Sequence, residues 1–279
     1  EFTITRIADR HFYVVSAGAA ERYDSDFLFK SLPQDSSVGL RNITNTRGCF
    51  VLAGPKSREV LSQLTDTALD NASFPWLTAQ TIEAGLAVDV YALRVNFVGA
   101  LGWELHFPIE YAHHLFDALF EAGKAFGLGM VGMRAMESLR LEKSYRMWGS
   151  DMTPDYTPFE AGLDRFVRMN KGAFTGKEAL ERQLAAGVPN RFVTLEVHGV
   201  TDADPLGNEP LFEEGGRMIG RATSGCYGHC LRKSLAIGYT RSEFAAPGTQ
   251  LSIEILGERK RATVVRESPY DPDNLELRA

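Results

Sequence analysis

The chain has 279 residues, which is enough to bury a large core and to form about one to three domains. Hydrophobic residues make up 44% of the sequence and charged residues 24%, as is typical of a globular protein. The net charge of −6 argues against nucleic-acid binding, because that function needs a clustered basic face. The apolar runs are short, so no membrane-spanning segment is predicted.

The chain has three cysteines, too few and too scattered for a disulfide framework, which favours a reducing compartment. That compartment is the cytoplasm, or the mitochondrial matrix if the protein is eukaryotic. No signal or transit peptide is recognisable. The segment 226–230 reads CYGHC and imitates metal-ligand spacing, but a zinc site of this kind has a second pair of ligands, so no metal is predicted.

The first half of the chain mixes strand and helix patterns. Strands are expected at residues 2–5, 12–15, 38–44, 48–53, 81–88 and 90–95. Helices are expected at residues 21–32, 57–64 and 111–126, the second with Ser57 as N-cap and the last ended by Gly127. The strand pattern begins at the first residues without an initiator methionine, which predicts a fragment that starts inside a domain.

The second half begins with two further helices and then becomes a β region. The helices are expected at residues 131–146 and 175–186, where Thr175 and Glu178 fit a capping box. Alternating segments follow at residues 193–197, 235–239, 251–255 and 262–265. The order of elements predicts an α+β fold that ends in a small all-β domain.

A carboxylate lies in the strand pattern after residue 101. By strand alternation Trp103 and Leu105 face one side, while Glu104 faces the other with Gly102 and His106. A carboxylate can bind a flat heterocycle that presents adjacent ring N–H and amino donors. An exposed strand carboxylate without a function is the alternative that the pattern alone leaves open.

A cation and an aromatic residue lie eleven positions apart in the helix predicted at residues 131–146. Eleven residues make about three turns, so Arg134 and Tyr145 are expected on one face. Arg140 lies on another face, where it can pair with Glu137. A solvated arginine and a packing tyrosine are the alternatives.

Two segments resemble a known family. They are residues 93–107, LRVNFVGALGWELHF, and residues 132–166, GMRAMESLRLEKSYRMWGSDMTPDYTPFEAGLDRF. They resemble the folate-binding module of glycine cleavage T-proteins (aminomethyltransferases), and most of all its branch in dimethylglycine and sarcosine dehydrogenases and oxidases. The resemblance implies a multi-lobed, cloverleaf-like α+β module with ferredoxin-like lobes, from which the first part, about 90 residues, is missing. It divides the chain into residues 1–37 (remnant of an N-terminal lobe), 38–188 (central folate-binding domain) and 189–279 (C-terminal β-barrel-like domain).

The resemblance also assigns residues to tetrahydrofolate. Glu104 matches the glutamate that grips the pterin, and Phe97 stands where relatives carry a tyrosine beside folate. Arg134 matches an arginine that binds the substrate complex, and Tyr145 is expected to contact folate or brace its site. Arg165 is expected to pair with the glutamate tail of folate because its guanidinium is positively charged.

Further residues are assigned to the pocket wall and to catalysis. The resemblance places Trp103, Trp148, Asp151 and Glu160 in the wall of the folate pocket. Glu1 falls on the position of an acidic residue that is the proposed catalytic carboxylate of the family, where it would orient the amine or move its proton.

The function that the resemblance implies is tetrahydrofolate-dependent one-carbon transfer. The module would capture the carbon released from an N-methyl amine such as dimethylglycine or sarcosine and form 5,10-methylenetetrahydrofolate. The chain has no fingerprint of an FAD site, so the oxidation is expected in an FAD-dependent dehydrogenase domain or subunit. A T-protein aminomethyltransferase that works with a lipoylated carrier protein, a non-catalytic folate-binding module, and a demethylase for a sulfonium methyl donor are the alternatives.

Overall fold

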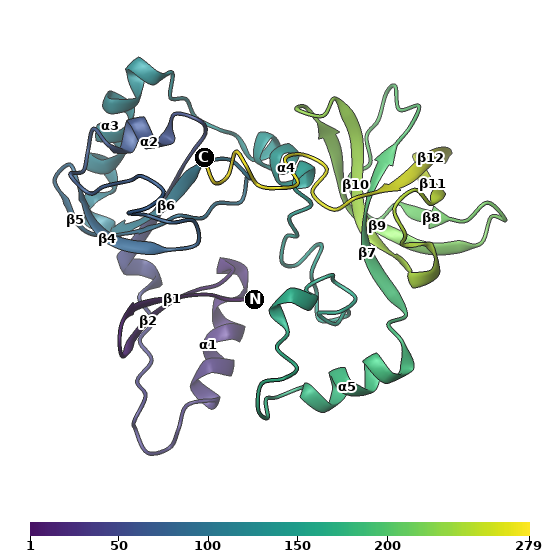
Figure 1. Ribbon diagram of the computed structural model, residues 1–279, viewed down its shortest axis with the longest axis horizontal. Helices are drawn as coiled ribbons and strands as arrows, with labels where there is room; N and C mark the ends of the chain where they lie inside the picture. The colour runs from purple at the N-terminus through teal and green to yellow at the C-terminus, as the bar shows by residue number, and fades with distance from the viewer. The chain divides into compact units, whose positions relative to one another are not determined.

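The computed structural model describes all residues from Glu1 to Ala279. They form two compact units, residues 1–130 together with 274–279, and residues 131–273. The first unit contains a hairpin and a helix-covered sheet, and the second contains a closed barrel (Figure 1). The prediction of an α+β fold with a C-terminal all-β domain is confirmed, whereas the cloverleaf arrangement and the boundaries after residues 37 and 188 stay predictions.

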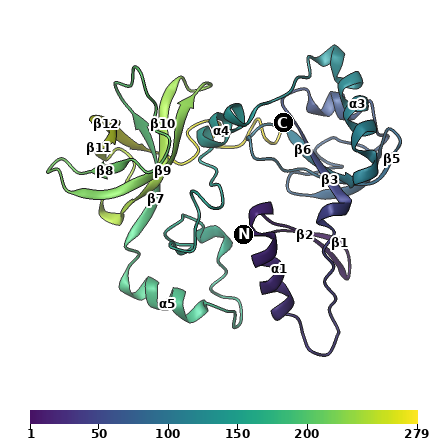
Figure 2. The same ribbon diagram turned by 180° about the vertical axis from the view of Figure 1, so that it is seen from behind.

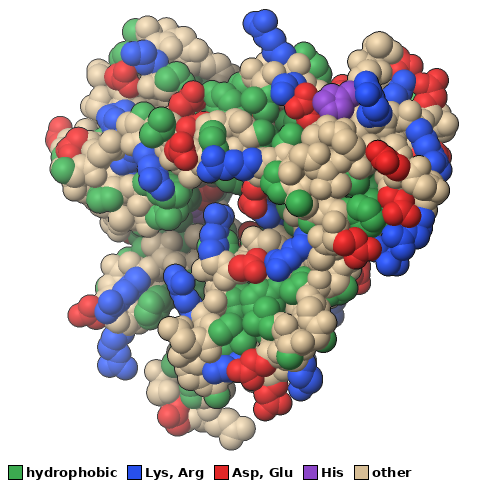
Figure 3. All heavy atoms as spheres, turned by 45° about the vertical axis from the view of Figure 1, so that its right-hand side comes forward, with side chains coloured by type: hydrophobic (Ala, Val, Ile, Leu, Met, Phe, Trp, Pro, Cys, Tyr) green, Lys and Arg blue, Asp and Glu red, His purple; other side chains and the backbone are tan.

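The surface carries mixed charges. Figure 3 shows acidic and basic side chains interspersed over the face in view, without a continuous basic area. No helix combines the length and the apolar character that crossing a membrane requires.

The core of the first unit lies between a four-stranded antiparallel sheet and two helices (Figure 2). The strand order is β3-β6-β5-β4. The elements are β3 (Arg47–Ala53), α2 (Ser57–Leu61), β4 (Ala79–Ala84), β5 (Ala87–Leu93), β6 (Gly102–Pro108) and α3 (Ala112–Gly123). The helices bury Val60, Leu61, Leu115 and Leu119 against strand residues that include Leu52, Ile82, Val90, Trp103, Leu105 and Phe107. The opposite face of the sheet carries Glu104 and His106 together with Val51 and Tyr91.

A hairpin and a helix precede this sheet. β1 (Thr3–Ala8) and β2 (His11–Val15) pair across the turn at residues 9–10, and α1 (Glu21–Lys30) follows. These elements confirm the predicted strands and helix. The hairpin lies next to the sheet, where the ring of Tyr13 packs edge-on against Tyr91 of β5, with 5.2 Å between centroids.

Three predictions for the first unit are wrong in detail. Residues 38–43 form no strand, because the Asn42 side chain accepts the backbone N–H of Thr44 at 2.9 Å and so replaces a strand hydrogen bond with a local turn. Ser57 is the first residue of α2 rather than its N-cap, and its hydroxyl donates to the carbonyl of Leu101 at 3.1 Å. The turn between β4 and β5 comes earlier than predicted, at Gly85, whose φ of 60° suits a residue without a side chain.

The second unit is built around a six-stranded closed barrel. Its strand order is β10-β7-β12-β11-β8-β9. The strands are β7 (Asn190–Val197), β8 (Pro210–Phe212), β9 (Met218–Gly228), β10 (Lys233–Arg241), β11 (Gln250–Ile255) and β12 (Glu258–Val265). The barrel is filled by alternating apolar residues such as Leu195, Ala236 and Ile253, each 0% exposed.

Two helices precede the barrel in the second unit, and both are shorter than predicted. α4 (Met133–Glu142) packs on β9 and β10, and it ends where Ser144 takes a φ of 56°. Tyr145 therefore lies beyond the helix, and its predicted position on one helix face with Arg134 is wrong. α5 (Lys177–Ala186) begins after Gly176, which has a φ of 92°, so the predicted capping box of Thr175 and Glu178 does not form.

Candidate functional site

A polar cluster occupies the face of the first unit's sheet that α2 and α3 leave free. Along β6, Trp103, Leu105 and Phe107 point into the core, each 0–1% exposed. The intervening residues Glu104 and His106 share the opposite face, as predicted, and their side chains meet at 3.2 Å. The Glu104 side chain keeps 26% of its surface exposed, so its carboxylate is held by the sheet and still reaches solvent.

Neighbouring strands extend this cluster. Register places Cys49 of β3 opposite His106 and Val51 opposite Glu104. Tyr91 of β5 lies on the other side of His106. Val51 is 55% exposed, so an apolar surface lies beside the carboxylate.

His106 connects the members of the cluster. It is only 4% exposed. Its Nε2 lies 3.2 Å from Glu104 Oε2 and 3.7 Å from Cys49 Sγ, and its Nδ1 lies 3.1 Å from the Tyr13 hydroxyl. With the proton on Nε2, the ring donates to the Glu104 carboxylate and accepts from Tyr13. His106 thereby holds the carboxylate in one orientation.

Two ionisable groups of the cluster, the Cys49 thiol and the Tyr13 hydroxyl, have raised pKa values. Removal from water raises the pKa of Cys49 to about 12, and the negative charge of Glu104 adds to this rise. Burial also raises the pKa of the Tyr13 hydroxyl, although the charge of Arg47 works in the opposite direction. Both groups are therefore neutral at physiological pH, and Glu104 supplies the negative charge of the cluster.

An arginine borders the cluster that sequence reasoning missed. Arg47 at the start of β3 forms an ion pair with Asp89 and donates to the Asp89 carbonyl at 2.6 Å. Its guanidinium lies over the Tyr91 ring, 4.0 Å from the centroid. The charge of Arg47 is thus paired within the sheet, and Glu104 retains His106 as its hydrogen-bond partner.

The loop between β5 and β6 contains Phe97. Asn96 shapes this loop, because its Oδ1 accepts the backbone N–H groups of Val98 and Gly99 at 3.0 and 2.9 Å and its Nδ2 donates to the Ala100 carbonyl at 2.6 Å. Phe97 itself is half-buried. Its predicted contact with folate stays a prediction.

Two other predicted residues of the first unit lie away from the cluster. Trp103 is fully buried, and Phe74 packs edge-on against it at 6.0 Å, on the face of β6 opposite to Glu104. This placement gives no support to a pocket wall at Trp103. Glu1 is exposed and precedes β1, and its catalytic role stays a prediction.

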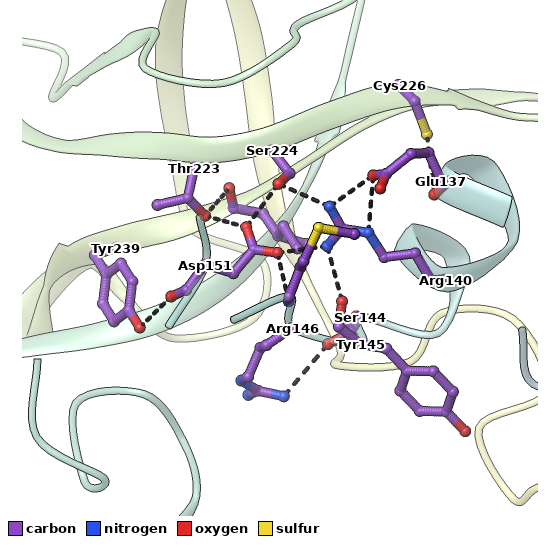
Figure 4. A network of polar contacts seen from close by, with 12 residues as sticks. Glu137, Arg140, Ser144, Tyr145, Arg146, Asp151, Thr223, Ser224, Cys226 and Tyr239 are labelled. Atoms are coloured by element: carbon purple, nitrogen blue, oxygen red, sulfur yellow. Dashed lines mark hydrogen bonds and ion pairs between the residues drawn. The ribbon is translucent and has the colours of Figure 1, made fainter. Parts of the chain in front are cut away.

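Asp151 is the centre of a buried network in the second unit (Figure 4). It is 0% exposed and accepts hydrogen bonds from Arg140 Nη1 at 2.5 Å and from Ser224 Oγ at 2.7 Å. Thr223 Oγ1 and the backbone N–H of Met147 donate to it at 2.6 and 2.9 Å. All of these donors belong to the protein, so Asp151 fastens the turn after α4 to β9.

Arg140 balances the charge of this network. It is 1% exposed and pairs with Glu137 at 2.7 Å, as predicted for residues three apart on a helix, in addition to Asp151. The spacing of Glu137 and Arg140 was the part of this network that the sequence could predict. The hydrogen bonds from the network to β9 join residues more than 70 positions apart, so the sequence pattern did not reveal them.

Glu160 is also committed to internal contacts. Its carboxylate accepts the backbone N–H and the hydroxyl of Thr157, both at 3.0 Å, and the amide of Asn190 at 2.9 Å. Burial raises the pKa of Glu160, but these hydrogen bonds outweigh it and hold the pKa below the ordinary value. Glu160 ties the 157–162 turn to the start of β7.

The remaining predicted residues of the second unit lie nearer its surface. Arg134 is exposed in the first turn of α4. Tyr145 is half-buried, and burial raises its pKa while the nearby charge of Arg165 lowers it. Arg165 is exposed in a 3₁₀ turn, Asp164–Phe166, and Trp148 is half-buried beside the Asp151 turn. Arg134, Tyr145 and Arg165 thus all belong to the second unit.

Comparison with known proteins identifies the family. The profile of the GCVT N-terminal domain matches residues 1–171, and that of the glycine cleavage T-protein C-terminal barrel domain matches residues 190–271. The chain belongs to the glycine cleavage T-protein family.

The relatives of this T-protein family member differ in length. This chain is 36% identical over 269 residues to dimethylglycine dehydrogenase of Rattus norvegicus, and the match covers 96% of this chain and 31% of that enzyme. It is 30% identical over 266 residues to an aminomethyltransferase of Desulfitobacterium hafniense, covering 95% of this chain and 71% of that protein. The crystal structure of aminomethyltransferase T of Bartonella henselae matches with a TM-score of 0.82 and 25% identity, over 97% of this chain and 72% of that one. The chain is an aminomethyltransferase-like T-protein module, and it spans about a third of the dehydrogenase that it resembles.

Proposed function

We propose that this module binds tetrahydrofolate and that Glu104 grips the edge of its pterin ring. The observation that carries the proposal is the Glu104 carboxylate, which is 26% exposed, fixed on a strand and oriented by His106. Adjacent N–H and amino donors of a pterin match the two oxygens of one carboxylate, and charged hydrogen bonds of this kind are the strong ones. Val51, 55% exposed beside Glu104, offers the ring an apolar surface.

The other predicted acidic residues are poorer candidates for pterin binding. Asp151 is 0% exposed and already accepts four hydrogen bonds from the protein. Glu160 is 6% exposed and accepts from Thr157 and Asn190. A ligand that displaced these donors would leave buried polar groups unpaired, which costs about 1–3 kcal/mol for each. Glu104 accepts a ligand without such a loss.

The proposed reaction is one-carbon transfer to folate. Tetrahydrofolate supplies nucleophilic nitrogens that take up a carbon at the oxidation level of formaldehyde. The residues of this chain would bind and orient the pterin through Glu104 and keep that carboxylate oriented through His106. Positioning of this kind provides most of the acceleration in reactions that need little covalent catalysis. Glu1 keeps its proposed role as the carboxylate that orients the amine or holds its proton.

Phe97 and the second-unit residues Arg134, Tyr145 and Arg165 keep their proposed roles in folate binding. Arg134 and Arg165 are exposed and Tyr145 is half-buried, so all three side chains reach the surface of the second unit. An arginine suits the carboxylates of a glutamate tail. Trp148 is proposed to support this surface.

An N-methyl amine such as dimethylglycine or sarcosine is the proposed source of the carbon. The 36% identity to rat dimethylglycine dehydrogenase supports this choice. Since the chain corresponds to 31% of that enzyme, we place the oxidation of the amine in an FAD-dependent dehydrogenase domain or subunit outside the residues described.

Aminomethyl transfer is the second candidate. The chain covers 71% of the Desulfitobacterium aminomethyltransferase, a much larger share than of the dehydrogenase. Such an enzyme would accept an aminomethyl group from a lipoylated carrier protein and release ammonia. Ammonia release that depends on the carrier separates the two functions, and folate binding without turnover in either assay would indicate a non-catalytic module.

Calorimetric titration with 5-formyltetrahydrofolate tests the proposed binding. Loss of charged hydrogen bonds in Glu104→Gln should weaken binding by about 2–4 kcal/mol, or about 30- to 1000-fold. Glu196→Gln is a matched control, because Glu196 also lies on a strand, is 22% exposed and stands two residues before a histidine, His198. Equal affinities for wild type and both variants would contradict the proposal.

A further inference from the structure

Three side chains of the Glu104 cluster have the chemistry of transition-metal ligands. The ligand atoms of Cys49, Glu104 and His106 all lie within 4.8 Å of one another. Cys49 and His106 are direct partners across β3 and β6, and Glu104 stands two residues before His106 on the same face. The backbone of two paired strands therefore fixes their spacing, which no loop has to provide.

The spacing matches a tetrahedral ion. Zinc bonds of about 2.3 Å to sulfur and about 2.0–2.2 Å to nitrogen and oxygen place tetrahedral ligand atoms about 3.4–3.6 Å apart. In the structure Cys49 Sγ lies 3.7 Å from His106 Nε2, and Glu104 Oε2 lies 3.2 Å from it. Both distances are within a few tenths of an ångström of these values, and the ligand atoms of Cys49 and Glu104 lie within 4.8 Å of each other.

The surroundings of His106 suit metal binding. The Tyr13 hydroxyl lies 3.1 Å from His106 Nδ1, and its ring packs edge-on against the imidazole at 5.4 Å. A partner on the second ring nitrogen is the usual way in which a protein orients a metal-binding histidine. With the imidazole proton on Nδ1, His106 donates to the Tyr13 oxygen and presents the Nε2 lone pair to an ion.

Access and charge also favour a cation. Cys49 as a residue is exposed although its thiol is partly removed from water, and Glu104 is 26% exposed, so an ion can enter and keep one coordination position open. The nearby cation, Arg47, is paired with Asp89. A thiolate and a carboxylate together neutralise a divalent ion.

We propose that Cys49, Glu104 and His106 bind one divalent transition-metal ion, with Zn²⁺ as the best match and a fourth position open. On binding, the sulfur–metal bond forms as the Cys49 thiol releases its proton to solvent, and the proton of His106 resides on Nδ1. The ion occupies Glu104, so it competes with a ligand that uses this carboxylate. This last consequence rests on the proposed function, whereas the metal site does not.

Titration of the chelator-treated 279-residue chain with Co²⁺, followed by absorbance, tests the site. We expect one ion per chain, with the thiolate charge-transfer band and the intense visible bands of tetrahedral Co²⁺. Zn²⁺ should remove both signals by displacement. An absence of these bands in the folded wild-type chain would overturn the proposal.

Cysteine variants locate the ion. Cys49→Ser should lose the charge-transfer band and weaken binding at least about 100-fold, because it removes a direct ligand. The double variant Cys226→Ser/Cys230→Ser should retain both, and the opposite pattern would contradict the assignment. Circular dichroism of each variant verifies folding. Folate titration in the presence of a chelator is independent of the ion, so its outcome judges the proposed function separately.

Discussion

Removal of the Asp151 carboxylate should destabilise the second unit strongly. Asp151→Ala leaves Arg140, 1% exposed, with Glu137 as its acidic partner, and leaves the hydroxyls of Thr223 and Ser224 without their acceptor. Breaking a buried ion pair from one side costs about 3–5 kcal/mol. Because Glu137 still neutralises part of the charge, we expect about 3 kcal/mol.

Thermal unfolding followed by circular dichroism measures this loss. A unit of this size changes its melting temperature by about 3 °C per kcal/mol, so Asp151→Ala should melt about 10 °C lower in the transition of the second unit. Asp155→Ala is the control, since Asp155 is exposed in the same turn and contacts Thr153 at 3.2 Å. If the melting temperature fell by less than about 3 °C in Asp151→Ala, or by equal amounts in both variants, Asp151 would not be the centre of a stabilising network.

Three further predictions concern the second unit. Gly162→Ala should lower the free energy of unfolding by about 1–3 kcal/mol, because Gly162 has a φ of 66° and an added Cβ would lie 2.7 Å from Arg146 Nη2. Gly172→Ala is the control and should leave the free energy of unfolding unchanged, because its Cβ would meet open space. The lowered pKa of Glu160 means that its carboxylate stabilises the fold above the unfolded value of about 4.3 and loses this effect as pH falls through the folded value. Melting temperatures of wild type and Glu160→Gln should therefore differ most near pH 7 and converge as the pH falls through the lowered pKa of the folded state, and a pH-independent difference would exclude this linkage. Arg165→Ala should weaken calorimetric binding of polyglutamylated folate more than that of the monoglutamate, and equal weakening would rule out the tail contact.

Local periodicity made much of the first unit predictable. The alternation of β6 placed Trp103 and Glu104 on opposite faces, and it did so because side chains on a strand change face at every residue. The barrel strands alternate in the same way. Alternation does not predict which residue of a neighbouring strand lies opposite a given residue. The contacts of Tyr13 and Cys49 with His106 could therefore not be predicted from the sequence.

The early end of α4 has its cause in contacts that are distant in sequence, whereas the missing strand at residues 38–43 comes from the local turn at Asn42. The pattern of α4 continues past Glu142, but Lys143 is buried and donates to the carbonyls of Tyr270 and Asp271 at 3.2 and 2.6 Å. These contacts coincide with the end of the helix before Tyr145. The pocket-wall role of Asp151 stays a prediction, and what the sequence did not show is that donors from β9 make it the centre of a buried network.

Coupling between Glu104 and the pterin amino group tests the central claim most directly. The affinities of wild type and Glu104→Gln should be measured for a reduced pterin and for its analogue without the 2-amino group. If Glu104 accepts that donor, the analogue binds wild type about 10- to 100-fold more weakly, whereas the two ligands bind Glu104→Gln almost equally. The same loss in both proteins would show that the amino group is bound elsewhere and would contradict the account.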